Sequence, residues 1–119
     1  MSVNYSYHLW FKVCRPARKK YKLTVNALLI LNACYLYQSV INKPFARYNL
    51  QQFVTYYNHV KIRYYVNLLI DKGYIIESGN YKGHPLYSIS PEGLQIIKEL
   101  NENYDKELYL FCNKYNIEL

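Results

Sequence analysis

The sequence predicts a mainly α-helical domain with one small β-hairpin. Apolar residues recur at steps of three and four in long segments, which is typical of helices that pack on a core. Two short β-rich runs, 74–77 and 86–89, flank a turn-rich stretch, which is typical of a hairpin. The expected order is an N-terminal basic segment, a helix, a short helix, a third helix, the hairpin and a long C-terminal helix.

Length and composition indicate one soluble domain. The chain has 119 residues, of which 51% are hydrophobic, enough for one modest core. No charged leader with an apolar centre opens it, and polar residues interrupt the longest apolar region, 25–41. We therefore expect neither a signal peptide nor a membrane span, and a cytoplasmic protein that does not contact a membrane.

Catalysis, metals and cofactors are not expected. Cys14, Cys34 and Cys112 lack C-x-x-C spacing, and the three histidines stand far apart. The sequence has neither a nucleophile elbow nor a phosphate-binding Gly-Lys-Ser/Thr loop. We expect a non-enzyme without metal or cofactor, whose cysteines are small core residues in a reducing compartment.

Positive charge is concentrated in residues 1–91. These residues contain 12 Lys and Arg against two acids, a net charge of +10, whereas residues 92–119 carry −3. A polyanion such as nucleic acid would therefore bind the basic part of the chain.

Residues 1–23 allow two interpretations. Their alternating apolar residues suit a strand, but one helical face is also apolar, formed by Val3, Tyr7, Trp10 and Cys14. We favour a helix that ends ahead of Pro16, because proline disrupts a helix interior.

Two helices are expected next. Thr24 is a good N-cap for a helix over 25–37 that is apolar on most sides and therefore buried. After a loop at 42–44, Asn49 can cap a short helix from Leu50 to about Tyr56.

The third helix leads into the hairpin. Asn58 can cap a helix to about Lys72, and Gly73 stands where a helix C-terminal glycine belongs. After the two β-rich runs, the sequence Ser90-Pro91-Glu92 restarts a helix, because Ser caps, Pro favours the first helical position and Glu complements the helix dipole.

The C-terminal helix carries one long apolar stripe, formed by Leu94, Ile97, Leu100, Tyr104, Leu108, Phe111 and Tyr115. So long a stripe exceeds what a small core can cover. It packs either on the basic N-terminal segment of the same chain or on a second subunit, which would give a homodimer through this helix and the N-terminal segment.

This order of elements is that of a winged helix-turn-helix, and two motifs resemble those of the MarR-type transcriptional regulators. VNLLIDKGYI, residues 66–75, resembles the L-x-x-K-G-Y/L-I end of that family's recognition helix. LYSISPEG, residues 86–93, resembles its second wing strand and following helix start, Y-x-L-T-x-x-G. The likeness covers about residues 23–103. The resemblance implies a single domain that binds double-stranded DNA and regulates transcription. Its expected parts are an N-terminal segment (1–23), the helix-turn-helix and wing (24–90) and a C-terminal helix (91–119).

One face of the third helix is expected to lie in the major groove, which admits a single helix. Opposite the apolar face stand Val60, Lys61, Arg63, Tyr64 and Asn67. Lys61 and Arg63 suit guanine edges or phosphates, and Asn67 suits adenine. Tyr64 suits a phosphate and Val60 a thymine methyl. The alternative is an ordinary solvated helix face.

Further basic residues are expected to contact the DNA backbone. On the wing these are Lys82 and His84; in the N-terminal segment they are Arg18, Lys19 and Lys20, flanked by Arg15 and Lys22. A solubilising charged linker is the alternative for the N-terminal group. The wing tip, SGNYKGH, departs from the family pattern because it lacks the usual pair of an acid and an arginine.

Many members of that family respond to small aromatic ligands or to cysteine oxidation, but no effector is predicted here. Trp10, Tyr35 and Tyr37 can line a ligand pocket or simply pack in a core. The basic neighbours of Cys14, Lys12 and Arg15, can lower its thiol pKa, so a redox switch is the alternative to a plain core residue. Two other functions stay open: a winged-helix module that binds proteins, and a DNA-binding accessory factor for replication or mobile elements.

Overall fold

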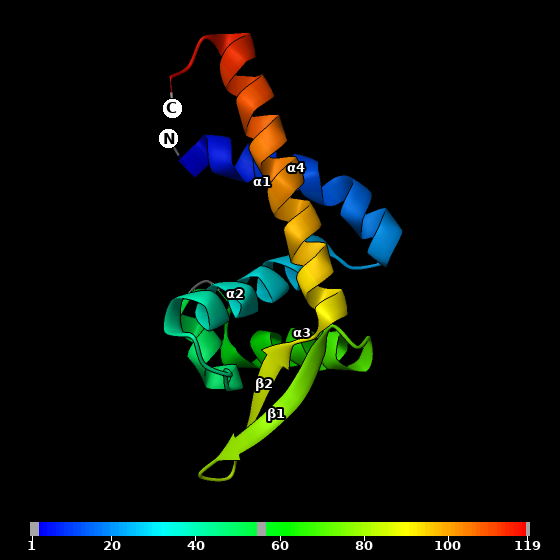
Figure 1. The fold of residues 1–119 in the computed structure, drawn as a ribbon, viewed down its shortest axis with the longest axis vertical. Coiled ribbons are helices and arrows are strands. Elements are labelled where there is room, and N and C mark those ends of the chain that lie inside the picture. Colours follow the sequence, from blue (N-terminus) through cyan, green and yellow to red (C-terminus); the bar gives the residue numbers. More distant parts are fainter. Residues whose placement is uncertain (1–2, 55–56, 119) are drawn as a thin grey trace. The chain divides into compact units, whose positions relative to one another are not determined.

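The computed structural model describes residues 3–54 and 57–118, with side chains from His8 onward. Figure 1 shows the element order α1 (Val3–Tyr21), α2 (Val25–Ile41), η1 (Arg47–Gln52), α3 (His59–Asp71), β1 (Ile75–Tyr81), β2 (His84–Ile89) and α4 (Pro91–Tyr115). The predicted class, mainly helical with a hairpin and a long C-terminal helix, is confirmed. The chain forms two compact units: the N-terminal residues up to Val25 together with those from Lys98 onward, and Asn26–Ile97.

Helix α1 does not end ahead of Pro16. It continues to Tyr21, so the predicted boundary is wrong, as is the alternative of a strand. An internal proline costs a helix about 3 kcal/mol. Apolar side chains on both sides of Pro16 are buried. Burial of a large apolar side chain stabilises a fold by about 1.5–3 kcal/mol, so together these side chains offset the cost of the proline. They are Leu9, Val13, Cys14 and Ala17.

The short helix, η1, begins earlier than predicted and is a 3-10 helix. Asn49 is its third residue rather than its cap, and the Asn49 side-chain oxygen accepts a hydrogen bond from the Ala46 N–H at 2.8 Å. This bond satisfies a donor at the helix start. The helix ends at Gln52; the predicted end, Tyr56, lies outside the described residues.

Helices α2 and α3 follow the predicted patterns. Helix α2 runs four residues further than residue 37 and is buried on most sides, as expected. The Asn58 side chain caps α3 by accepting from the Lys61 N–H at 2.9 Å. Gly73, with a φ of +81°, ends it. The buried face of α3 consists of Ile62, Val66 and Leu69.

The hairpin strands are longer than predicted, and most of the stretch expected to be a loop is strand. Only Lys82 and Gly83 form the turn, and their φ values of 50° and 83° are those that a two-residue hairpin turn requires. The Asn80 side chain accepts from the Gly83 N–H at 3.0 Å, which stabilises the tight turn. A bulge between Glu77 and Gly79 shifts the strand register.

A short bridge joins the loop after α2 to the wing. Phe45 N–H donates to the Tyr87 carbonyl at 2.9 Å, and Tyr87 N–H donates to the Phe45 carbonyl at 2.7 Å. The Phe45 side chain is fully buried. The bridge therefore fixes the position of η1, which begins two residues later, against the wing.

The junction between wing and α4 is a buried hydrogen-bonded joint. The Ser90 hydroxyl donates to the Gly73 carbonyl at 2.6 Å and accepts from the Gly93 N–H at 3.1 Å. Ser90 is therefore the N-cap predicted from sequence. A Cβ on Gly93 would collide with the Tyr74 carbonyl oxygen, so this approach requires glycine.

In the other unit, α1 and the second half of α4 are paired antiparallel, because higher residue numbers on one helix meet lower numbers on the other. Figure 1 shows the two helices crossing. The contacts are ion pairs of Lys12 with Glu107 (2.9 Å) and Lys20 with Glu99 (3.0 Å), and ring pairs of Trp10 with Tyr104 and His8 with Phe111.

The predicted stripe on α4 is only partly buried. Ile97 and Leu100 are buried, but Leu94 and Tyr115 are about half exposed, with exposed fractions of 49% and 56%. Ile96, which lies outside the stripe, is buried instead, so the core side of α4 is rotated relative to the prediction. Among the described residues, no helix taken singly has the length and apolarity to span a membrane.

Candidate nucleic-acid interface

The outward face of α3 is exposed along its whole length. Ile62, Val66 and Leu69 turn the opposite side into the core, which leaves the predicted contact residues in solvent. These are Val60, Lys61, Arg63, Tyr64 and Asn67, all of them exposed. The single acid of α3, Asp71, is its last residue. The result is a basic and polar surface on a rigid helix.

A polar network fixes α3 against the start of α2. Tyr57 hydroxyl donates to the Asn26 side-chain oxygen, and the Asn26 amide donates to the Tyr65 hydroxyl at 3.1 Å. Tyr64 packs edge-on against Tyr65, with ring centroids 5.1 Å apart. The contact with Tyr65, which the network binds, therefore restrains the exposed ring of Tyr64.

Arg47, at the first position of η1, is a site residue that sequence reasoning missed. Its Nη2 donates to the Asn67 side-chain oxygen at 2.5 Å, and its guanidinium lies 4.8 Å from the centroid of the Tyr87 ring. Residues 20 positions apart in the chain meet here. No local pattern signals this pair, because contacts between distant residues, such as the Phe45–Tyr87 bridge and the Tyr48–His84 ring pair, bring η1 to α3 and the wing.

A hollow of about 250 Å³ lies beside this pair. It is lined by Arg47, Tyr48, Gln51, His59, Ile62 and Arg63, with no acid among them. Two guanidinium groups and an imidazole give it the chemistry that binds phosphate oxygens. The Nε of Arg47 is buried and has no hydrogen-bond partner in the described part of the chain.

The two predicted wing residues occupy different positions. Lys82 lies in the turn, and its ammonium is 5.4 Å from the centroid of the neighbouring Tyr81 ring. His84 instead meets η1, where its ring packs edge-on against Tyr48 at 5.5 Å. Both side chains are exposed, but His84 also helps to hold the wing against η1.

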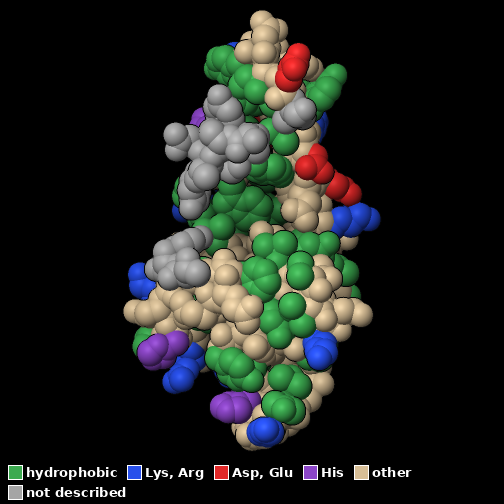
Figure 2. All heavy atoms as spheres, turned by 90° about the vertical axis from the view of Figure 1, so that its left-hand side faces the viewer, with side chains coloured by type: hydrophobic (Ala, Val, Ile, Leu, Met, Phe, Trp, Pro, Cys, Tyr) green, Lys and Arg blue, Asp and Glu red, His purple; other side chains and the backbone are tan. Residues whose placement is uncertain are grey.

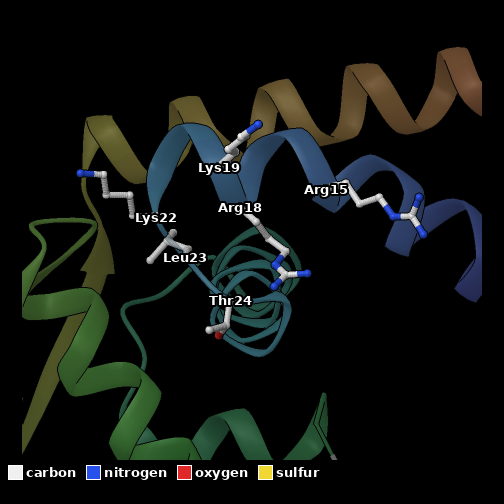
Figure 3. A pocket seen from close by; sticks show the side chains of 6 residues that line it. All are labelled: Arg15, Arg18, Lys19, Lys22, Leu23 and Thr24. Atoms are coloured by element: carbon white, nitrogen blue, oxygen red, sulfur yellow. The ribbon is translucent and has the colours of Figure 1, made fainter.

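The basic N-terminal segment lines a shallow hollow of about 400 Å³, formed by Arg15, Arg18, Lys19, Lys22, Leu23 and Thr24. Figure 3 shows the charged groups diverging: Arg18 extends toward the Thr24 side, whereas Arg15 and Lys19 point away from it. Such a surface suits the spaced charges of a polymer backbone better than one small anion.

Lys20, the third residue predicted in this segment, lies in an ion pair. Its ammonium is 3.0 Å from Glu99 Oε1, and the hydrogen bond with Glu99 raises the pKa of Lys20. Arg18 and Lys19 thus line the same shallow hollow, whereas Lys20 is paired with Glu99 on α4.

The structure confirms that Cys14, Cys34 and Cys112 are core residues and contradicts the alternative of an activated Cys14 thiol. Burial raises the pKa of this thiol to about 12, which outweighs the opposite effect of the Arg18 charge. Burial also raises the pKa of Cys34. The alternative fails because the neighbouring cations are exposed while the sulfur is fully buried. Within 3–54 and 57–118, no three His, Cys, Asp or Glu residues gather as metal ligands.

Two of the three aromatic residues considered as pocket walls, Tyr37 and Trp10, are packed on other rings. Tyr37 is buried and packs edge-on against Phe53, with centroids 6.0 Å apart. Trp10 contacts Tyr104 at 6.5 Å. These contacts are those of aromatic core packing.

Both units carry a net positive charge. Residues 26–97 contain six Lys and Arg against three acids, and the other unit, residues 1–25 and 98–119, contains nine against five. On the face drawn in Figure 2, Lys, Arg and His side chains lie over the unit that carries the hairpin, and the visible acids lie on the other unit with Lys and Arg side chains beside them.

Solved structures of transcription regulators share this fold. Staphylococcus aureus MarR in complex with salicylate and kanamycin matches with a TM-score of 0.77 and 17% identity, over 98% of this chain and 75% of that one. MepR, which regulates the S. aureus multidrug efflux pump MepA, matches with a TM-score of 0.75 and 10% identity, over 96% and 84%. A MepR variant bound to an oligodeoxyribonucleotide matches with a TM-score of 0.71 and 9% identity, over 95% and 83%.

Comparison at the level of sequence gives no such match: no protein-family model and no curated protein matches the chain. The structural likeness, which spans nearly the whole chain, confirms the fold predicted from the two motifs. The chain therefore has the fold of the MarR-type winged-helix transcription regulators.

Proposed function

We propose that this protein is a transcriptional regulator that binds double-stranded DNA sequence-specifically, with α3 in the major groove and the β1–β2 wing near the backbone. The observation that carries the proposal is the exposed face of α3, which presents Lys61, Arg63, Tyr64 and Asn67 on a helix whose other side is buried. A major groove accepts a helix with such a face. The similar fold of a MepR variant bound to an oligodeoxyribonucleotide supports this assignment.

Phosphate contacts are assigned to the surfaces around α3. The hollow lined by Arg47, His59 and Arg63 lies at the start of α3, and the N-terminus of a helix favours phosphate groups. Lys82, in the turn at the wing tip, extends the basic surface of this unit. Arg18 and Lys19 in α1 form a separate basic surface on the other unit. Contacts of this kind position a protein on DNA without reading its sequence.

A cytoplasmic homodimer is part of the same proposal. Apolar side chains remain exposed on the unit formed by α1 and the end of α4: Phe11, Tyr109, Leu110 and Tyr115. Covering them with a second copy would bury apolar area and pair two α3 helices for an inverted repeat, with half-sites about one helical turn apart. Sedimentation should show a dimer that Leu110→Lys dissociates and Val60→Lys does not.

The test is selection of bound fragments from a random double-stranded DNA library at near-physiological salt. The wild type is compared with Lys61→Ala/Arg63→Ala and with the control Lys98→Ala/Lys106→Ala, which removes two exposed charges from α4 instead. We expect a palindromic motif for the wild type and the control, and none for the α3 variant. Binding that depends on salt but selects no motif would contradict the regulator and favour an accessory factor, and absence of DNA binding would favour a protein-interaction module.

A further inference from the structure

Arg47 is anchored on two sides at the base of α3. Its guanidinium lies on the ring of Tyr87, which is buried and whose backbone is hydrogen bonded in both directions to Phe45. From this position Arg47 reaches the Asn67 side-chain oxygen, with 2.5 Å between nitrogen and oxygen. A stacked, partly buried guanidinium loses little further freedom when it makes such a bond.

The chemistry of the pair determines which end of the Asn67 carboxamide faces Arg47. A guanidinium has donors only, whereas a carboxamide has an acceptor oxygen and a donor NH₂ group. The oxygen must therefore point to Arg47, and the NH₂ group must point away from it. Asn67 is exposed, one helical turn beyond Arg63 and Tyr64 on the proposed contact face.

We propose that Arg47 is a positioning residue that makes Asn67 present its amide donors to the DNA, so that Asn67 reads guanine. This inference rests on the proposed function of α3. An asparagine that reads adenine uses both ends of its amide, accepting from N6 and donating to N7. Here the oxygen is turned toward Arg47, so the NH₂ donors face away from it. These donors suit guanine, whose groove edge offers the two acceptors N7 and O6, and they oppose the N4 donor of cytosine.

The proposal changes the base expected from residue type alone, which was adenine. It also accounts for the placement of Arg47, which belongs to the same unit as the wing and α3 but lies outside the exposed face of α3. Holding the carboxamide in one orientation before binding removes part of the entropy cost of recognition.

Two substitutions test the mechanism in the random-library selection. Asn67→Asp keeps an oxygen toward Arg47 but replaces the NH₂ donors with an acceptor, so the preferred base at one position of each half-site should change from guanine to cytosine. Arg47→Met keeps a long apolar side chain on Tyr87 but has no donor. The amide can then rotate, and adenine should be enriched beside guanine, with discrimination at that position reduced about tenfold.

A control and the outcomes separate this inference from the proposed function. Gln95→Glu adds the same charge on α4, where the side chain is exposed, and should leave the motif unchanged. If the wild type selects a motif and neither Asn67→Asp nor Arg47→Met changes any position of it, the proposed role of Arg47 is overturned while the proposed function stands. A wild type that selects no motif would overturn both. Because Asn67 is exposed, Asn67→Asp should fold normally, which circular dichroism verifies.

Discussion

Each of the two units of this chain is stabilised internally, and the kinds of interaction inside the two units differ. The unit Asn26–Ile97 is joined by backbone hydrogen bonds and buried caps, as at Ser90 and at the Phe45–Tyr87 bridge. In the unit formed by α1 and the end of α4, the described polar contacts between the two helices are ion pairs of partly exposed side chains. They lie beside tilted aromatic rings and buried apolar side chains.

The difference shows where stability and specificity reside. Buried, geometrically fixed hydrogen bonds cost much free energy when broken, whereas exposed ion pairs contribute little. The proposed DNA-contacting unit can therefore hold α3, η1 and the wing in place by its own contacts. The other unit retains exposed apolar side chains on α4 that a second copy can cover.

The largest effect is expected for Gly93→Ala at the joint between wing and α4. The added methyl would meet the Tyr74 carbonyl and the Ile89 side chain, so the free energy of unfolding should fall by about 3 kcal/mol. Urea denaturation followed by circular dichroism measures this. Gln95→Ala, an exposed site on the same helix, is the control, and equal stability of the two variants would contradict the tight joint.

A smaller loss is expected for Ser90→Ala. The variant removes the hydroxyl that caps α4 and donates to the Gly73 carbonyl, which should lower the free energy of unfolding by about 1–2 kcal/mol. The control is Ser39→Ala, at an exposed position on α2. A change at Ser90 no larger than that at Ser39 would show that the joint does not depend on this hydroxyl.

Breaking an ion pair of the other unit should have a still smaller effect, with a distinct pH dependence. Hydrogen bonds from Tyr21 and Lys20 hold the pKa of Glu99 below its usual value of 4.5. A lowered pKa stabilises the fold above the unfolded-state value and loses this contribution as the pH falls through the folded-state value.

Glu99→Gln should therefore lower the Tm by no more than about 3 °C at pH 7. The difference from the wild type should shrink below about pH 4.5. Thermal scans between pH 3 and pH 7 measure it. A difference that grows on acidification would have the wrong sign for this ion pair.

Cysteine labelling gives the most sensitive comparison of the units. All three thiols are buried, and burial raises the pKa of Cys14 and Cys34, so iodoacetamide should modify none of them appreciably at pH 8 without denaturant. In urea below the unfolding midpoint, Cys14 and Cys112 should react before Cys34, because their unit opens at lower free energy. Mass spectrometry of the labelled peptides gives the order, and earlier labelling of Cys34 would reverse the comparison.

Local chemistry was sufficient to predict much of this protein from its sequence. Several correctly predicted features depend only on residues a few positions apart in the chain. They are the helix caps at Asn58 and Ser90, the helix end at Gly73, and the buried and exposed faces of α3. Hydrogen bonds and apolar faces within one helix are fixed by spacing alone. Their order along the chain was enough to predict a winged helix.

Other features depended on contacts between residues distant in the chain, which spacing does not encode. Helix α1 continues through Pro16 because burial offsets the proline, and the strands extend because two residues suffice for the turn. Tertiary packing buries the thiol of Cys14 and raises its pKa, although its neighbours in sequence are basic. Arg47 and Asn67 stand 20 positions apart in the chain and meet where η1 packs beside α3 and the wing, so the tertiary structure alone decided which residue contacts Asn67 on the exposed face of α3.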